Sequence, residues 1–140
     1  MLAQLNTTNA PCGDGYDQIV IRHAYEDKVG GRTIDASAYP KDFIRRGHLI
    51  IKAADGTLKP MPLAENGNAY GDLPASHTYY GVANQTAFKQ GEGIQVGILE
   101  RFEMNHKVVD PIAGVYGLAG AQLTAVKTAL PLATFKGDQD

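Results

Sequence analysis

Apolar and polar side chains alternate from Ile94 to Met104 more regularly than anywhere else in the chain. The apolar face of this segment holds Ile94, Val96, Ile98, Phe102 and Met104, and only Leu99 and Glu100 interrupt the pattern. A period of two is typical of a β-strand with one buried face, because successive side chains point to opposite sides of a sheet. The segment therefore predicts a long strand that covers a core.

Four other segments also have strand character, through β-branched residues or unbroken apolar runs. They are Gln18 to Arg22, Thr33 to Asp35, Leu49 to Lys52 and Thr78 to Phe88. Between the second and third of them, Pro40 to Arg46 predicts a single helical turn with proline at its first position. Gly47 would end that turn in a left-handed conformation.

A hairpin is predicted at Asp55-Gly56, between the buried apolar run and a second apolar segment, Leu58 to Leu63. Both residues tolerate a positive φ, which tight hairpin turns require. Pro60 and Pro62 have no N–H to donate, so we expect the second strand to lie at an edge of its sheet.

A helical period is clear from Ala119 to Leu130, where Leu123, Val126 and Leu130 lie on one face. Pro131 disfavours helical geometry at the preceding residue and ends the helix. A helix this short is marginal alone, so we expect it to cover a sheet. The core is then expected to bury together Ile50, Val82, Val96, Ile98, Leu123 and Val126.

These elements predict a mainly β fold, a small partly open barrel or sandwich with the C-terminal helix packed on it. The chain has 140 residues, which fits one domain, and we place that domain at residues 18–135. Residues 1–17 are rich in Asn, Thr, Gly and Pro, and we expect them to form an extended N-terminal arm. Residues 136–140 are polar and are expected to form a loose tail.

Charge and length argue against several classes of function. The net charge is −2, the signs alternate and no basic run stands out, so no nucleic-acid partner is expected. No apolar run approaches the ~20 residues that span a bilayer, and Met1 to Thr8 does not resemble a signal peptide. Cys12 is the single cysteine, which excludes an intrachain disulfide and is compatible with synthesis in a reducing cytosol.

No pattern predicts catalysis, a cofactor or a metal site. No two histidines have i, i+4 spacing and none lies near Cys12, so a zinc site is not expected. Ser76 and His77 are adjacent and would point apart on a strand. The glycine-rich stretches at 91–93 and 114–120 lack the marks of a phosphate-binding loop. We therefore expect a protein that is not an enzyme.

Carboxylate pairs and tyrosines each allow a functional and a purely structural interpretation. Glu100 and Glu103 fall on opposite faces of the predicted strand, which favours solvated charges over acid–base work. Seven tyrosines suggest an interface, because tyrosine combines a large apolar area with a polar tip, although packing in the core is the alternative for each. In the arm, Leu2, Leu5 and Tyr16 are apolar anchors in a polar string, and such segments often order on a partner.

Several short phrases follow one another between about residues 30 and 132. They are Gly31 to Asp35, Ile44 to Lys52, Asp55 to Pro62, Tyr70, Leu73-Pro74, His77 to Val82 and Lys127 to Leu132. In this order they resemble the head auxiliary and head-fibre proteins of tailed bacteriophages, including crAss-like phages of Bacteroidetes, and the broader class of capsid-decoration proteins. Glu103 to Tyr116 and residues 1–17 depart from the family's pattern.

The resemblance implies a structural virion protein, made in the host cytoplasm, that binds the outer surface of a capsid shell and reinforces it. Its partner would be the major capsid protein, and contacts with further copies, as a trimer or quasi-symmetric cluster, or with other head proteins are compatible with it. Leu2, Leu5 and Tyr16 then become candidate capsid contacts. A subunit that cross-links capsomers stabilises the assembled state by mass action.

Other functions stay open. A head-fibre base or virion adaptor is the nearest alternative, although head-fibre proteins usually continue where this chain stops at Asp140, which favours a compact auxiliary subunit. A small-molecule-binding β-barrel and an enzyme with an unrecognised site belong to other classes. Binding to empty capsids would favour the capsid-decoration protein or the head-fibre base, and a stable monomer that binds small molecules would favour the barrel.

Overall fold

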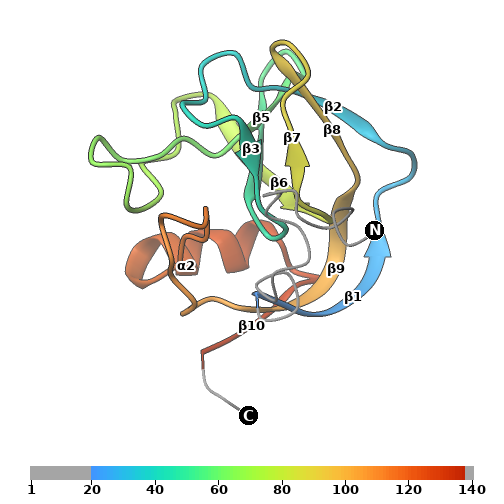
Figure 1. Ribbon diagram of the computed structural model, residues 1–140. Helices are drawn as coiled ribbons and strands as arrows, with labels where there is room; N and C mark the ends of the chain where they lie inside the picture. Colours follow the sequence, from blue (N-terminus) through green and yellow to red (C-terminus); the bar gives the residue numbers. More distant parts are fainter. Residues whose placement is uncertain (1–19, 138–140) are drawn as a thin grey trace, which may run out of the picture.

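Antiparallel strands make up most of the fold, and one helix lies against them (Figure 1). The computed structural model describes residues 20–137. Its strands are β1 Ile21–Asp27, β2 Arg32–Asp35, β3 Phe43–Ile44, β4 Leu49–Ala53, β5 Leu58–Pro60, β6 His77–Ala83, β7 Ala87–Phe88, β8 Gly93–Val96, β9 Ile98–Asn105 and β10 Thr134–Lys136. The helix, α2, spans Gly120–Ala129, close to its predicted bounds.

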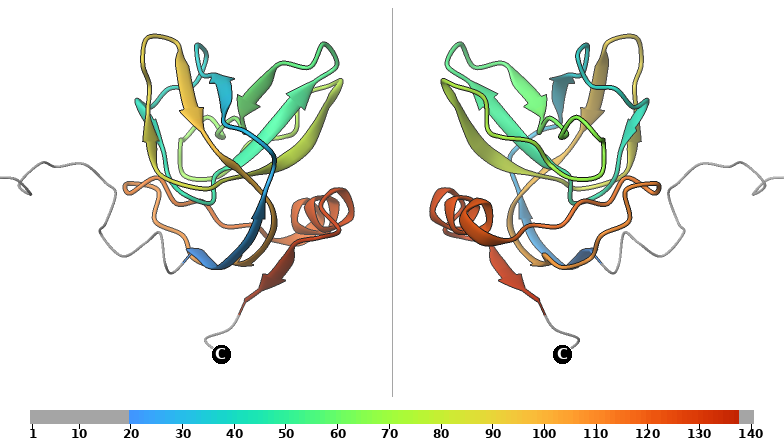
Figure 2. Two further views of the ribbon diagram at one scale, coloured as in Figure 1. Left: turned by 90° about the vertical axis from the view of Figure 1, so that its right-hand side faces the viewer. Right: turned by 90° about the vertical axis from the view of Figure 1, so that its left-hand side faces the viewer.

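The strands form one large sheet and two small ones. The large sheet has the order β1-β9-β6-β4-β5, and β10 pairs in parallel with β9. β2 pairs with β8, and β3 pairs with β7. The sheets curve around a common interior and do not close into a barrel (Figure 2). The predicted mainly β fold with one packed C-terminal helix is confirmed.

β5 and β2 approach each other without pairing, and we call the gap between these two strands the open seam. The Met61 N–H donates to Leu49 O at 2.8 Å, so the alternation of the ladder turns the backbone of Pro60 away from β4. Proline has no N–H to offer a further strand. β5 therefore ends the sheet, and the prediction of an edge strand is confirmed.

The segment from Ile94 to Met104 is two strands rather than the single strand that was predicted. β8 and β9 are separated at Gly97, and they pair with different partners: β8 with β2, and β9 with β1, β6 and β10. The alternation predicted extended backbone correctly. It could not show that the chain turns from one sheet into another halfway along.

A β-bulge explains the interruption of the pattern in β9. Leu99 lies opposite Asp27 and Arg101 lies opposite Glu26, which leaves Glu100 as the extra residue. Leu99 is buried on the face that Phe102 continues, because the extra residue resets the alternation by one position.

Buried side chains form two clusters instead of the single core that was predicted. Val82 and Val126, with half-buried Leu123 beside them, belong to the first cluster, and Ile50, Val96 and Ile98 belong to the second. β4 explains the division, since Leu49 and Ile51 face the first cluster while Ile50 faces the second. Both faces of this strand are covered, as its unbroken apolar sequence predicted.

Two local predictions are wrong. The segment from Pro40 to Arg46 contains β3 in place of a helical turn, because Phe43 pairs with Phe88 across the chain and the two rings lie 5.8 Å apart. Lys136, placed in the loose tail, belongs to β10 and pairs with Asn105. The left-handed conformation at Gly47 is confirmed by its φ of 94°, and a Cβ there would lie 2.6 Å from Val20.

Candidate protein-binding surfaces

The predicted capsid contacts Leu2, Leu5 and Tyr16 lie outside the described residues, as does Cys12. The arm and its contacts therefore stay predictions. The described chain begins at Val20, which is buried and leads directly into β1. Residues 1–19 thus join the domain at the start of an edge strand of the large sheet.

The tyrosines divide sharply by exposure. Tyr39, Tyr70 and Tyr116 are buried, which is the core alternative that the sequence left open. Tyr79 and Tyr80 are half-buried on β6. Tyr25 on β1 is 59% exposed, so it is the described tyrosine best placed to contact a partner.

Tyr25 on β1 is the centre of an exposed aromatic and cationic surface that also includes Arg101 of β9. The His23 ring stacks against it with centroids 5.8 Å apart, and the Arg101 guanidinium lies 5.5 Å from the Tyr25 ring. Tyrosine and arginine are the residue types that most often dominate binding energy at protein interfaces. We call His23, Tyr25 and Arg101 the β1 surface.

His48 lies at the centre of the buried tyrosines. Its Nε2–H donates to Met61 O at 3.1 Å, and the rings of Tyr39, Tyr70 and Tyr116 meet it at centroid distances of 5.3, 5.2 and 5.9 Å. Burial lowers the pKa of His48 to about 4, so the ring is neutral at neutral pH. This histidine holds the core together and has no open side from which a substrate could approach.

Tyr70 ends the β4–β5 ladder together with His48. The Leu49 N–H donates to the Tyr70 hydroxyl at 3.0 Å, while Met61 O accepts from the His48 ring. The Met61 N–H already donates to Leu49 O, and a complete ladder pair would add the return bond from the Leu49 N–H to Met61 O. Two side chains thus satisfy backbone groups that the sheet leaves without strand partners.

Tyr70→Phe should therefore lower the free energy of unfolding by about 1–3 kcal/mol, because the buried Leu49 N–H loses its acceptor. Urea denaturation of the variant and the unchanged chain measures this difference. Tyr25→Phe removes the same hydroxyl from an exposed ring and should change stability by less than about 0.5 kcal/mol. Equal effects of the two substitutions would contradict the role given to Tyr70.

Glu100 and Glu103, the two carboxylates considered for acid–base catalysis, each have a basic partner of their own. Glu100 lies 3.5 Å from the Lys28 ammonium, and Glu103 lies 3.7 Å from the Arg22 guanidinium and 4.0 Å from Lys136. Such partly exposed pairs contribute little to stability. Their geometry fits the solvated charges that the sequence favoured.

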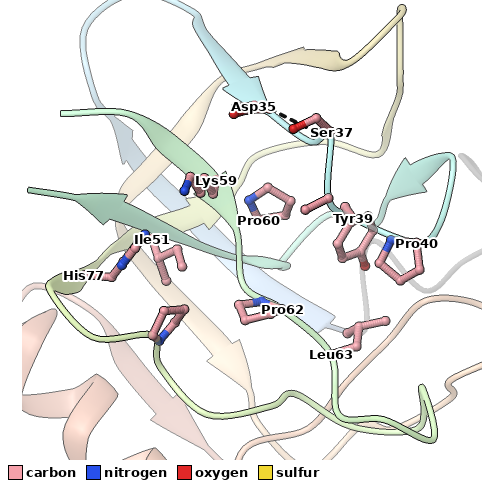
Figure 3. A pocket seen from close by; sticks show the side chains of 12 residues that line it. Asp35, Ser37, Tyr39, Pro40, Ile51, Lys59, Pro60, Pro62, Leu63 and His77 are labelled. Atoms are coloured by element: carbon pink, nitrogen blue, oxygen red, sulfur yellow. Dashed lines mark hydrogen bonds between the residues drawn. The ribbon is translucent and has the colours of Figure 1, made fainter. Parts of the chain in front are cut away.

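A groove runs along the free edge of β5, at the open seam between β5 and β2 (Figure 3). Its volume is about 320 Å³, and prolines and other apolar side chains form most of its surface. We call it the β5 groove; it is lined by Asp35, Ser37, Ala38, Tyr39, Pro40, Ile51, Lys59, Pro60, Pro62, Leu63, Pro74 and His77. The Ser37 N–H donates to Asp35 at 3.0 Å and lowers the pKa of that carboxyl, which therefore stays ionised.

An isoleucine at the tip of a turn between β9 and α2 is almost fully exposed to solvent. Ile112 is 93% exposed, and we call residues 110–114 the Ile112 turn. The Asp110 and Val115 backbones exchange two hydrogen bonds of 2.9 Å at its base. Sequence analysis missed this feature, although Asp110-Pro111 followed by Gly114 is a turn signal around an apolar residue.

Within residues 20–137, no group of three or more His, Cys, Asp or Glu side chains could hold a metal ion. Across the same residues, no helix is both long and apolar enough to cross a membrane.

Comparison with known proteins gives no relative. No family model matches the chain, and neither the curated proteins nor the solved structures contain a significant match.

Proposed function

We propose that the protein is a structural virion protein that binds the outer surface of a phage capsid shell and reinforces it. The β1 surface carries the proposal, because exposed Tyr25 lies on the edge strand β1, which follows residues 1–19 in the chain, and Arg101 of the neighbouring strand β9 lies against its ring. An edge strand also offers unpaired backbone groups to a partner. The major capsid protein would be that partner, and neither catalysis nor a cofactor is needed.

The phrases that resemble phage head proteins support the same proposal. Four of them coincide with β2, with β4, with the β4–β5 hairpin and with β6, and the last three of these elements are neighbours in the large sheet. In this account they form the framework, while the β1 surface and the N-terminal arm make the contacts with the shell.

Tyr25→Ala tests the proposal by co-sedimentation with empty shells assembled from the major capsid protein of the same virus. The unchanged chain should sediment with the shells, and the variant should bind about tenfold or more weakly, as expected for an interface hot spot. Val29→Ala is the matched control, because Val29 is 91% exposed in the loop that follows β1. A chain beginning at Asp17 should likewise show lower occupancy at limiting concentration.

One result would contradict shell binding itself, and another would contradict the surface assigned to it. The unchanged chain would stay in the supernatant at every concentration, or the Tyr25 variant and the chain beginning at Asp17 would both decorate shells as fully as the intact protein. The second result would leave shell binding in place and move it away from the β1 surface and the arm.

A further inference from the structure

Two exposed features of the domain have complementary shapes and chemistry. The Ile112 turn is a rigid apolar projection, and the β5 groove is an apolar hollow at the open seam between β5 and β2. We propose that the Ile112 turn of one copy inserts into the β5 groove of a neighbouring copy. Copies would thereby contact one another head to tail.

The turn is fixed before any partner arrives. Lys41 Nζ donates to Pro111 O at 2.6 Å, and Arg45 Nε donates to Ala113 O at 2.9 Å. Gly114 N–H closes the turn on Pro111 O at 3.1 Å. A backbone held in this way loses little conformational entropy when the turn binds, whereas the backbone at Val29, which is as exposed, precedes two glycines.

The groove suits such a projection. Ile51 lies at its base, and Pro60, Pro62 and Leu63 line it from β5 onward (Figure 3). A volume of about 320 Å³ has room for an aliphatic side chain and part of the turn that carries it. The opposite wall is largely exposed between residues 37 and 40, so the groove would leave a small ligand in contact with water. Pockets that hold small ligands usually enclose most of their surface.

Charges at the two features can be matched in pairs. Asp110 and Lys41 flank the Ile112 turn, and Asp35 and Lys59 flank the groove. Each feature therefore presents one charge of either sign beside its apolar centre. Opposite charges around an apolar contact fix its orientation more than they raise its affinity.

The occupant has to come from another molecule. Lys41 and Arg45 tie the turn to the segment that follows the groove wall at Pro40, so the turn cannot leave this position to fill the groove of its own chain. Made head to tail, as proposed here, a contact between a projection and a hollow is heterologous and repeats from copy to copy.

One turn in one groove buries far less than the ~1,200 Å² typical of a stable complex, so the free protein should associate weakly. On a shell, neighbouring copies are held at high effective concentration and the same contact becomes substantial. This reinforcing role rests on the proposed function, whereas the contact itself does not.

Intermolecular paramagnetic relaxation tests the contact without any shell. One full-length copy carries Cys12→Ser and Ala38→Cys with a nitroxide attached at the groove wall. It is mixed at high concentration with an isotopically labelled copy that has no nitroxide. The methyl signals of Ile112 should broaden several-fold more than those of Val29, its equally exposed control.

A second variant keeps the test independent of the Ile112 signal. Ile112→Ser in the labelled copy should reduce the broadening of the nearby Val109 methyls to the level seen at Val29. Equal broadening of Ile112 and Val29, or selective broadening of another exposed methyl such as Leu132, would overturn the proposal. Because no capsid is present, failure here leaves shell binding to be judged by co-sedimentation.

Discussion

Ile98→Ala should lower the free energy of unfolding by about 2–5 kcal/mol, among the largest effects that a single substitution in this domain can have. Ile98 is fully buried in the second cluster and pairs with Ala83 at the junction of β6 and β9. A Cβ at Gly81 would lie 2.6 Å from the Ile98 side chain, so the isoleucine packs directly on the β6 backbone. A paired sheet cannot move inward to fill the space, and the cavity should persist.

Urea denaturation at constant pH measures this loss as a lower midpoint with an unchanged slope. Val29→Ala is the control, since it removes the same kind of aliphatic group from a side chain that is 91% exposed. Its effect should stay within about 0.5 kcal/mol. A comparably small effect of Ile98→Ala would mean that the face of β9 has been assigned wrongly.

Acid should destabilise the protein through His48. The pKa of His48 is about 4 in the folded state, against 6.5 for an unperturbed histidine, chiefly because burial disfavours the charged ring. Between these two values the unfolded chain binds more protons than the folded one, so the free energy of unfolding falls as the pH falls. The histidine alone should remove roughly 2 kcal/mol between about pH 7 and about pH 4.5.

Denaturation curves at several pH values, compared with those of His48→Gln, measure this dependence. Glutamine keeps a donor for Met61 O and cannot take up the proton, so the variant should lose stability less steeply over the same range. If the variant does not fold, the imidazole signals of His48 in the unchanged chain give the same information by NMR. An imidazole that titrates near 6.5 in the folded protein would contradict the account.

The parts of the fold that depend on local pattern could be predicted from the sequence. Alternation placed the buried residues of β8 and β9 except Leu99, and apolar spacing with Pro131 placed α2. The prolines of the second hairpin segment gave its edge position, since a missing N–H acts in the same way in any fold.

The errors arise where distant residues decide the local structure. β3 exists because Phe43 finds Phe88, a contact that no window around Pro40 contains. The strand break at Gly97 reflects a change of partners, and the bulge at Glu100 reflects the register against β1. Two clusters replace one core for the same reason, since one strand can serve both sides of a sheet.

The exposed surfaces were the least predictable features. Seven tyrosines suggested an interface, and the fold shows that three of them pack around His48 while Tyr25 faces solvent. The β5 groove combines residues from four separate segments around Pro60, so its shape depends on the tertiary fold. Composition indicated that binding surfaces exist, and the fold indicates where they lie.

The central claim, that this protein decorates the outside of a capsid shell, is tested most directly by imaging. Shells assembled from the major capsid protein of the same virus are reconstructed by electron cryomicroscopy with and without the protein. The account predicts added density on the outer surface, of a size that fits residues 20–137, with β1 turned toward the shell. Identical reconstructions, or added density on the inner surface alone, would contradict it.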